Sequence, residues 1–135
     1  MEDGTVVPIR SDRDIIVARH EGRRMAADLG FAGSELTLIA TAISELARNI
    51  VKFAHRGEIS IRAVQNGTRS GISIIAKDEG PGIPDLSAAM KDGFSTSKGL
   101  GLGLPGTRRI MDDFEIDSQP GAGTTVIVKK WLPPT

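Results

Sequence analysis

Hydrophobic positions recur at two different spacings along the chain, and the change in spacing separates helices from strands. Over residues 11–30 and again over 34–53, apolar side chains return every three or four positions, which is typical of an amphipathic helix. After residue 57 the spacing falls to two, because Ile59 and Ile61 alternate with polar neighbours as in a half-buried strand. The pattern therefore predicts two helices followed by extended structure.

The flanking segments add strands on both sides of this central part. A short strand is predicted at residues 5–9, where Pro8 indicates a sheet edge because proline cannot donate to a ladder. Asn66-Gly67 has the composition of a hairpin turn. The other expected elements are a return strand over 71–77, a short helix over 86–90 at most, a helix over 105–113, and strands over 114–118 and 124–131.

This order of elements predicts the fold class. The helices are grouped apart from antiparallel hairpins, which favours an α+β fold of two layers, a mixed but mostly antiparallel sheet with helices on one face. Ser11 and Asp14 match a capping box at the start of the first helix, and Gly30 is suited to its end. Neither a repeat nor a linker interrupts residues 1–135, so a single domain is expected.

Composition then excludes several functions. The chain has no Cys and only two His, which rules out disulfides and Cys-ligated zinc and makes a His-built metal site improbable. Its 17 basic residues equal its 17 acidic residues, and this balance argues against a nucleic-acid partner. No apolar run approaches the ~18 residues of a membrane span, and residues 1–14 are acidic and polar, unlike a signal peptide. We therefore expect a cytoplasmic protein without a membrane partner.

The first candidate site lies on the second predicted helix. Glu45 and Asn49 are one helical turn apart on its polar side, and Lys52 lies roughly on the same side. A solvated helix face is the plain alternative. Asn is a poor helix former, however, and its presence inside such a regular helix weakens that alternative.

Glycine supplies the second candidate site. The chain has 16 Gly in 135 residues, more than the ~7% of an average protein. Asp78 follows a predicted strand directly, where a carboxylate can accept from an exocyclic amine, and Gly80 and Gly82 let a flat base approach the backbone. A simple turn is the alternative for this run.

Two further features complete the set. Gly99, Gly101 and Gly103 precede a predicted helix, and the N–H groups at a helix start suit phosphate oxygens. Thr124 places a hydroxyl at the start of the last strand.

Taken together and in this order, these motifs resemble the GHKL ATPases, which include gyrase-type, MutL-type and histidine-kinase ATP-binding domains. The resemblance extends over residues 36–131. The runs 42–50, 78–85, 92–97 and 130–132 are most similar to the small bacterial switch-protein serine kinases of the RsbT type, which belong to the stressosome. Anti-sigma-factor kinases of the SpoIIAB or RsbW type are the nearest alternative.

The resemblance implies a Bergerat-type ATP-binding fold and a serine/threonine kinase that uses ATP and Mg²⁺. Its substrate would be a STAS-domain antagonist, in a partner switch of a bacterial stress response that includes a downstream phosphatase or sigma-regulatory target. The second function class is a nucleotide-gated binding module with little kinase activity. The intact pair of Glu45 and Asn49 favours the kinase.

The resemblance also implies roles for individual residues. Glu45 would be the general base, Asn49 the Mg²⁺ ligand, and Asp78 the acceptor for the adenine amine, with Thr124 as a helper. Arg48 and Lys52 would neutralise phosphate charge. The remaining nucleotide-binding residues would be Gly80, Gly82 and Ile83, followed by Ser95, Thr96, Lys98, Gly99, Leu100, Gly101, Leu102 and Gly103, with the three glycines of the last group in a lid over the triphosphate.

Overall fold

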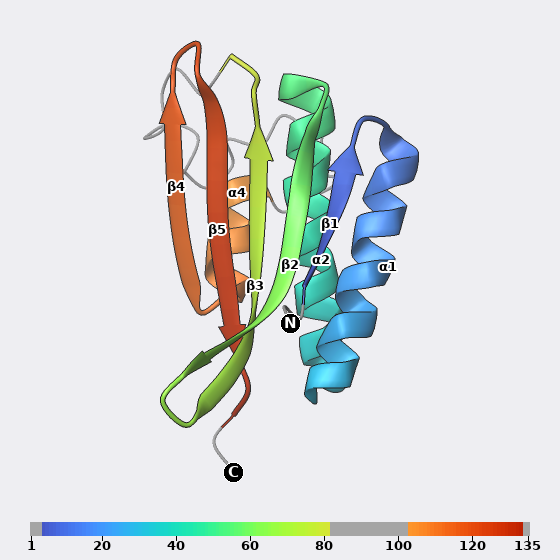
Figure 1. The fold of residues 1–135 in the computed structure, drawn as a ribbon, viewed down its shortest axis with the longest axis vertical. Coiled ribbons are helices and arrows are strands. Elements are labelled where there is room, and N and C mark those ends of the chain that lie inside the picture. Colours follow the sequence, from blue (N-terminus) through green and yellow to red (C-terminus); the bar gives the residue numbers. More distant parts are fainter. Residues whose placement is uncertain (1–3, 82–102, 134–135) are drawn as a thin grey trace.

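The computed structural model describes residues 4–81 and 103–133, which form a sheet with helices packed against one face (Figure 1). Five strands lie in the order β1-β2-β3-β5-β4. They are β1 (Gly4–Ile9), β2 (Gly57–Asn66), β3 (Arg69–Asp78), β4 (Asp113–Gln119) and β5 (Gly123–Trp131). The helices are α1 (Asp12–Leu29), α2 (Ser34–Asn49), the π-helical η1 (Ile50–Ala54) and α4 (Gly103–Ile110). The predicted two-layer α+β fold is confirmed.

Every neighbouring pair among the described strands is antiparallel. The expected mixed sheet is thus an antiparallel one over this part of the chain. β2 and β3 form a long hairpin, β4 and β5 form a second, and β3 pairs with β5 so that the two hairpins lie side by side. β1 takes the edge position that Pro8 predicted.

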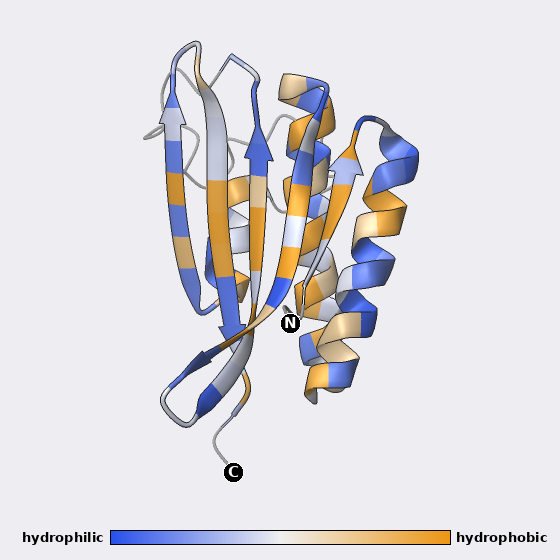
Figure 2. Cartoon of the chain, in the orientation of Figure 1, coloured by the Kyte–Doolittle hydropathy of each residue, from blue (hydrophilic) through white to orange (hydrophobic). Residues whose placement is uncertain are grey.

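The core lies between the sheet and α2. Alternate strand residues are buried in this core. They lie within the hydrophobic, orange parts of the strands in Figure 2. On the sheet these residues are Ile59, Ile61, Ile72, Ile74, Val126 and Val128, and on α2 and η1 they are Ile39, Ile43, Leu46 and Ile50. This packing fixes α2 along the sheet and therefore fixes the direction of its polar residues.

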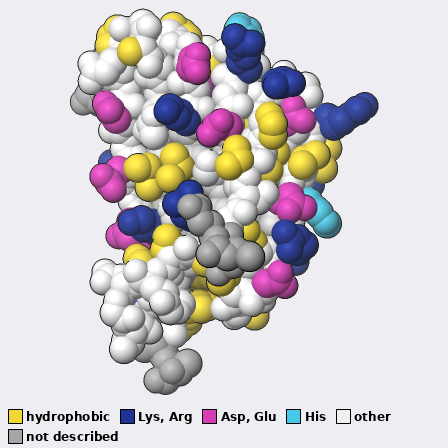
Figure 3. All heavy atoms as spheres, in the orientation of Figure 1, with side chains coloured by type: hydrophobic (Ala, Val, Ile, Leu, Met, Phe, Trp, Pro, Cys, Tyr) yellow, Lys and Arg dark blue, Asp and Glu magenta, His cyan; other side chains and the backbone are white. Residues whose placement is uncertain are grey.

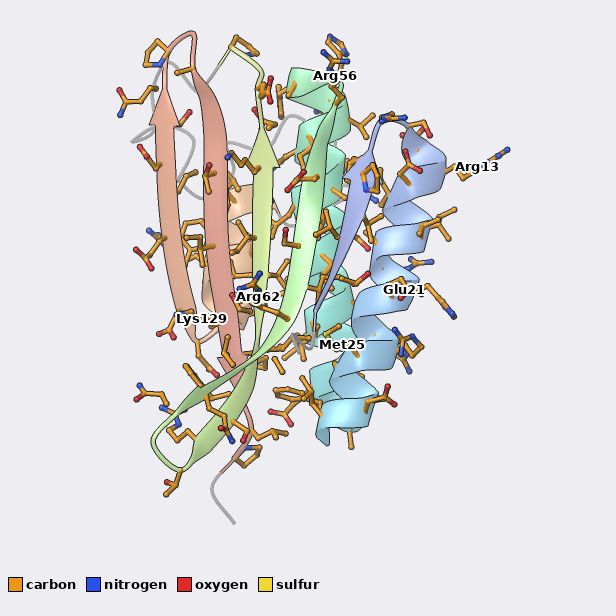
Figure 4. The ribbon with its side chains drawn as sticks, in the orientation of Figure 1. Arg13, Glu21, Met25, Arg56, Arg62 and Lys129 are labelled. Carbon is orange, nitrogen blue, oxygen red and sulfur yellow. The ribbon has the colours of Figure 1, made fainter. Side chains whose placement is uncertain are left out.

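The opposite face of the sheet carries no described helix. It faces the viewer in Figure 3, where acidic and basic side chains are interspersed with hydrophobic ones. Arg62 of β2 and Lys129 of β5 lie on this face (Figure 4). With charges of both signs mixed, it has the character of a solvated surface, and the candidate residues lie elsewhere.

The end of α2 differs from the prediction. Helical spacing placed Phe53 on the apolar face, but α2 ends at Asn49 and the chain continues in η1, where His55 N–H donates to the Ile50 carbonyl at 2.8 Å. This bond spans five residues instead of four, so the wider turn rotates later side chains away from the core face. Phe53 is consequently 54% exposed, with the Lys52 ammonium 5.4 Å from its ring centroid.

One capping contact and one further helix boundary also differ from the prediction. Ser11 is the N-cap of α1, but its side chain makes no capping bond; the Asp14 carboxylate instead accepts from Arg10 N–H at 2.8 Å. The last helix begins at Gly103, two residues before Pro105, and ends at Ile110. The possible helix at 86–90 lies outside the described residues.

Candidate functional site

Glu45 lies on α2 and is buried, with 6% of its surface exposed. Its Oε1 accepts from Gly103 N–H at 3.0 Å, and its Oε2 accepts from Nη1 of Arg48 at 2.5 Å. A solvated helix face, the plain alternative for this residue, is therefore excluded. A charged group is rarely buried unless it is paired, and here each oxygen has its own donor.

A groove of about 440 Å³ opens beside Glu45, between α1 and α2. Arg19 and Arg23 line it from α1, one helical turn apart, and neither forms an ion pair with a described residue. The polar residues that line it from α2 are Thr37, Thr41, Ser44, Glu45 and Arg48. The groove therefore presents more positive than negative charge around one buried carboxylate.

Asp78 is the last residue of β3, as the strand pattern predicted. Its Oδ1 accepts two backbone N–H groups, from Gly80 at 2.9 Å and from Thr124 at 3.2 Å. None of the hydrogen bonds among the described residues reaches Oδ2. One oxygen thus fixes the carboxylate to two chain segments, and the other is available as an acceptor.

The register of the strands places Thr124 beside Asp78. It pairs with Asp78 across β3 and β5, and with Ser118 across β4 and β5. Its hydroxyl lies 2.7 Å from the Ser118 hydroxyl, and Ser118 is buried. Asp78 and the two hydroxyl residues therefore form one polar row across the ends of three strands.

Two glycines make close backbone approaches around Asp78. A Cβ on Gly80 would lie 2.5 Å from the Ala54 Cβ, so the residues after β3 pack directly against η1. Gly123 has a φ of 90°, in the left-handed region that favours glycine, and a Cβ there would lie 2.2 Å from the Asp78 carbonyl oxygen. Both positions tolerate no side chain without a backbone shift.

Asn49 closes α2 and is half-buried. Its side-chain amide makes no hydrogen bond to residues 4–81 or 103–133. An amide oxygen without a protein partner suits a hard cation such as Mg²⁺, which binds oxygen ligands and retains several from water or phosphate. The described residues contain no group of three or more His, Cys, Asp or Glu side chains that could hold a metal ion. A cation at Asn49 would therefore need further oxygen ligands from water or phosphate.

The two parts of the site meet where α2 passes into η1. Gly57 lies between them, because a Cβ there would be 3.0 Å from both Ile50 Cγ2 and Asp78 Cβ. Ile50 follows Asn49 directly, so the end of α2 and the end of β3 converge at this point. Lys52 is exposed on η1 beside Phe53.

Several predicted residues cannot be placed. Only Gly103 of the glycine-rich segment is described, as the first residue of α4 with a φ of 68°. The predicted nucleotide-binding residues that lie outside the described residues are Gly82, Ile83, Ser95, Thr96, Lys98, Gly99, Leu100, Gly101 and Leu102.

The structure adds residues that sequence reasoning did not select. Arg19 and Arg23 could have been found from the sequence, because they are four residues apart and therefore lie on one side of the predicted helix, near the buried Gly22. Ser118 could not, since a serine at the end of a strand is common and its contact with Thr124 depends on register. Arg48, which the resemblance assigns to phosphate, donates to Glu45.

Comparison with known proteins places the chain in a family. Residues 34–134 match the family model described as histidine kinase-, DNA gyrase B-, and HSP90-like ATPase. The chain is 50% identical over 132 residues to the serine/threonine-protein kinase RsbT of Bacillus subtilis, covering 98% of this chain and 99% of that protein. It is 34% identical over 113 residues to an anti-sigma F factor of Thermoanaerobacter, covering 79% and 78% of the two chains.

A solved structure supports the fold. The RsbU and RsbW domains of a Mycobacterium tuberculosis protein match with a TM-score of 0.63 and 20% identity, over 96% of this chain and 33% of that one. No helix in the described part of the chain is long and apolar enough to cross a membrane. The motif order, the two-layer fold and the two sequence relatives agree with one another. This chain belongs to the histidine kinase-, DNA gyrase B- and HSP90-like ATPases, and within them to the RsbT type.

Proposed function

We propose that this chain is an ATP-dependent serine/threonine kinase whose substrate is a STAS-domain antagonist protein. The observation that carries the proposal is a buried carboxylate, Glu45, in the wall of a groove that opens to solvent. A general base must be held within reach of the proton it accepts and must be shielded from bulk water. The 50% identity to a serine/threonine kinase supports the same activity.

Asp78 and Thr124 are proposed to select adenine. The Oδ2 of Asp78 has no partner among the described residues, so it can accept from the exocyclic amine of the base. Gly82 would leave room for the ring. When bound, ATP supplies the phosphoryl group, and Mg²⁺ neutralises charge on its phosphates. Asn49 is proposed to hold the Mg²⁺ with its amide oxygen, which has no partner among the described residues, and Lys52 to face the phosphates.

Glu45 is proposed to accept the proton of the acceptor hydroxyl. It keeps a lone pair for this purpose, because each carboxylate oxygen can accept more than one hydrogen bond and the described residues supply one donor to each oxygen. The hydroxyl would enter along the groove between α1 and α2. A protein surface docked over the groove would exclude water and so favour transfer over hydrolysis.

Arg19 and Arg23 are proposed to recognise the acceptor protein. Both lack an ion pair with a described residue and both line the groove. Guanidinium groups bind carboxylates well, so an acidic segment beside the acceptor Ser or Thr would complement them. The proposed partner is therefore a protein with an acidic segment. The equal numbers of basic and acidic residues in the chain do not favour a nucleic-acid partner.

The cellular role proposed is a cytoplasmic partner switch in a bacterial stress response, with a downstream phosphatase or sigma-regulatory target as the second partner. An anti-sigma-factor kinase is the second candidate, favoured by the 34% identity to an anti-sigma F factor. A nucleotide-gated binding module is the third, and it would bind the partners without transfer.

The experiment is transfer of labelled phosphate from Mg-ATP to purified candidate STAS proteins, with the acceptor located by mass spectrometry. We expect a phosphoserine or phosphothreonine on one STAS protein. Rapid ATP hydrolysis without any phosphoprotein would instead identify an ATPase. ATP-dependent complex formation without transfer would identify a binding module.

A further inference from the structure

We propose that Glu45 has a second role: its carboxylate caps the first turn of α4, and Arg48 is the positioning residue that orients it. The capping part depends only on the geometry of α2 and α4. The part that concerns catalysis rests on the function proposed above.

The capping contact joins residues that are 58 positions apart. The first N–H groups of a helix have no partner within the helix and are usually satisfied by a side chain at the N-cap. In α4 the Gly103 N–H donates instead to Oε1 of Glu45 at 3.0 Å. A carboxylate on α2 therefore accepts from the first described N–H group of α4, and it interacts favourably with the positive end of the helix.

The same peptide is also held from inside α4. The hydroxyl of Thr107 donates to the Gly103 carbonyl at 2.9 Å, and Thr107 is fully buried. Leu104, Pro105 and Gly106 are buried between these two points. Gly103 thus has a fixed position at the junction between α4 and the preceding segment, with a φ of 68° that favours glycine.

Arg48 holds the other side of the carboxylate. Its Nη1 donates to Oε2 of Glu45 from one turn further along α2, and 38% of the Arg48 side chain is exposed compared with 8% for Glu45. Donors on both oxygens restrict rotation of the carboxylate, since turning it would break one charge-assisted bond. The guanidinium is therefore engaged in orienting the base, a role different from the phosphate neutralisation that the resemblance implied.

The consequence is a coupling between the base and the start of α4. A displacement of Gly103 that breaks its bond to Oε1 removes one of the two contacts that orient Glu45. The reverse also holds, because loss of the Glu45 carboxylate removes the cap of α4.

The capping part is tested by measuring the hydrogen-exchange rate of the Gly103 amide in the full chain, with NMR as the readout. Glu45→Ala should speed this exchange at least about tenfold, because the amide loses its acceptor. The amides of Ile61 and Ile74 in the core should keep their protection, which verifies that the variant is folded. Equal Gly103 protection in the wild type and in Glu45→Ala would overturn the cap.

The positioning part is tested at Arg48. Arg48→Met removes the charge but keeps most of the side-chain length. It should lower kcat for phosphotransfer about tenfold or more, leave the Kd for ATP within about twofold, and speed exchange at Gly103. Arg48→Lys should recover part of kcat, since a cation remains in reach of Oε2. Arg24→Met, which removes an exposed arginine of α1 outside the groove, should change none of these.

Two results would contradict the positioning role. A tenfold weaker Kd for ATP in Arg48→Met, with Gly103 exchange unchanged, would make Arg48 a phosphate ligand. Wild-type kcat in Arg48→Met would remove any role in catalysis. A wild-type chain that transfers no phosphate would refute the proposed function and leave the exchange experiment as a separate test of the cap.

Discussion

Asp78 uses one carboxylate oxygen to hold two backbone N–H groups, while no described residue contacts the other. This division makes Asp78→Asn a clean substitution at the residue scale. The amide oxygen can keep both backbone bonds, and the new NH₂ group then takes the place of the free acceptor. A donor would face the donor of the adenine amine, and a buried mismatch of this kind is costly.

We therefore predict that Asp78→Asn weakens ATP binding by at least ~1.4 kcal/mol, about tenfold in Kd, without a comparable loss of stability. Isothermal titration calorimetry measures the first quantity and thermal unfolding the second. Equal ATP affinity in the variant and the wild type would remove Asp78 from the nucleotide site.

Sequence reasoning reaches some of these residues and not others for physical reasons. Asp78 could be found because a strand pattern ends at it and glycines follow, which is a local signal. The contact of Glu45 with Gly103 could not, since it depends on how α2 and α4 pack after the chain has passed through three intervening elements. The resemblance assigns Arg48 to phosphate, but Glu45 and Arg48 are three residues apart on α2, so helical spacing alone could have predicted their ion pair.

At the scale of elements, the turn between β4 and β5 supports the polar row at the strand ends. Gly121 and Gly123 both have a φ in the left-handed region, 81° and 90°. A Cβ on Gly121 would meet nothing within 4 Å, whereas one on Gly123 would lie 2.2 Å from the Asp78 carbonyl oxygen. A side chain at Gly121 would therefore cause backbone strain alone, whereas a side chain at Gly123 would cause both backbone strain and a steric clash.

We predict that Gly121→Ala costs about 1 kcal/mol of unfolding free energy, from the left-handed conformation alone. Gly123→Ala should cost about 3 kcal/mol, because overpacking against β3 adds to the same strain, and it should also weaken ATP binding by moving Asp78. Urea denaturation and calorimetry check both. Equal losses of unfolding free energy in the two variants would show that the close contact between residue 123 and the Asp78 carbonyl does not affect stability.

Element boundaries were predicted well where spacing is regular and poorly where it changes. The hairpin of β2 and β3 followed from Asn66-Gly67, and the edge position of β1 followed from Pro8, whereas the pairing of β3 with β5 has no local signal. Phe53 was placed in the core because a single helical period was extended past Asn49. The π-helical turn of η1 has no signal in the hydrophobic pattern, so its rotation of Phe53 into solvent was missed.

At the scale of the whole molecule, the site can be reached from two directions, and different residues line each of them. Asp78 and Thr124 lie where β3 and β5 end and begin, while the groove with Arg19 and Arg23 lies between the helices. Nucleotide and acceptor protein would thus reach Glu45 and Asn49 from different directions. Substitutions in the groove should affect the acceptor without affecting the nucleotide.

We predict that Arg19→Glu combined with Arg23→Glu raises KM for the STAS acceptor about tenfold or more and leaves the Kd for ATP unchanged, since reversed charges repel an acidic segment. Arg13→Glu is the matched control, because Arg13 is exposed on the same helix and points away from the molecule (Figure 4). An unchanged KM in the double variant would place the docking surface elsewhere.

Glu45 is proposed to perform the chemistry of phosphotransfer while other residues bind ATP. The most direct measurement is single-turnover phosphotransfer to the STAS acceptor by Glu45→Gln, which keeps the size of the side chain, together with its Kd for ATP. We predict a Kd within about twofold of the wild type and transfer slowed by roughly 10²-fold or more, the usual scale for a general base. Transfer at the wild-type rate, with ATP still bound, would contradict the claim.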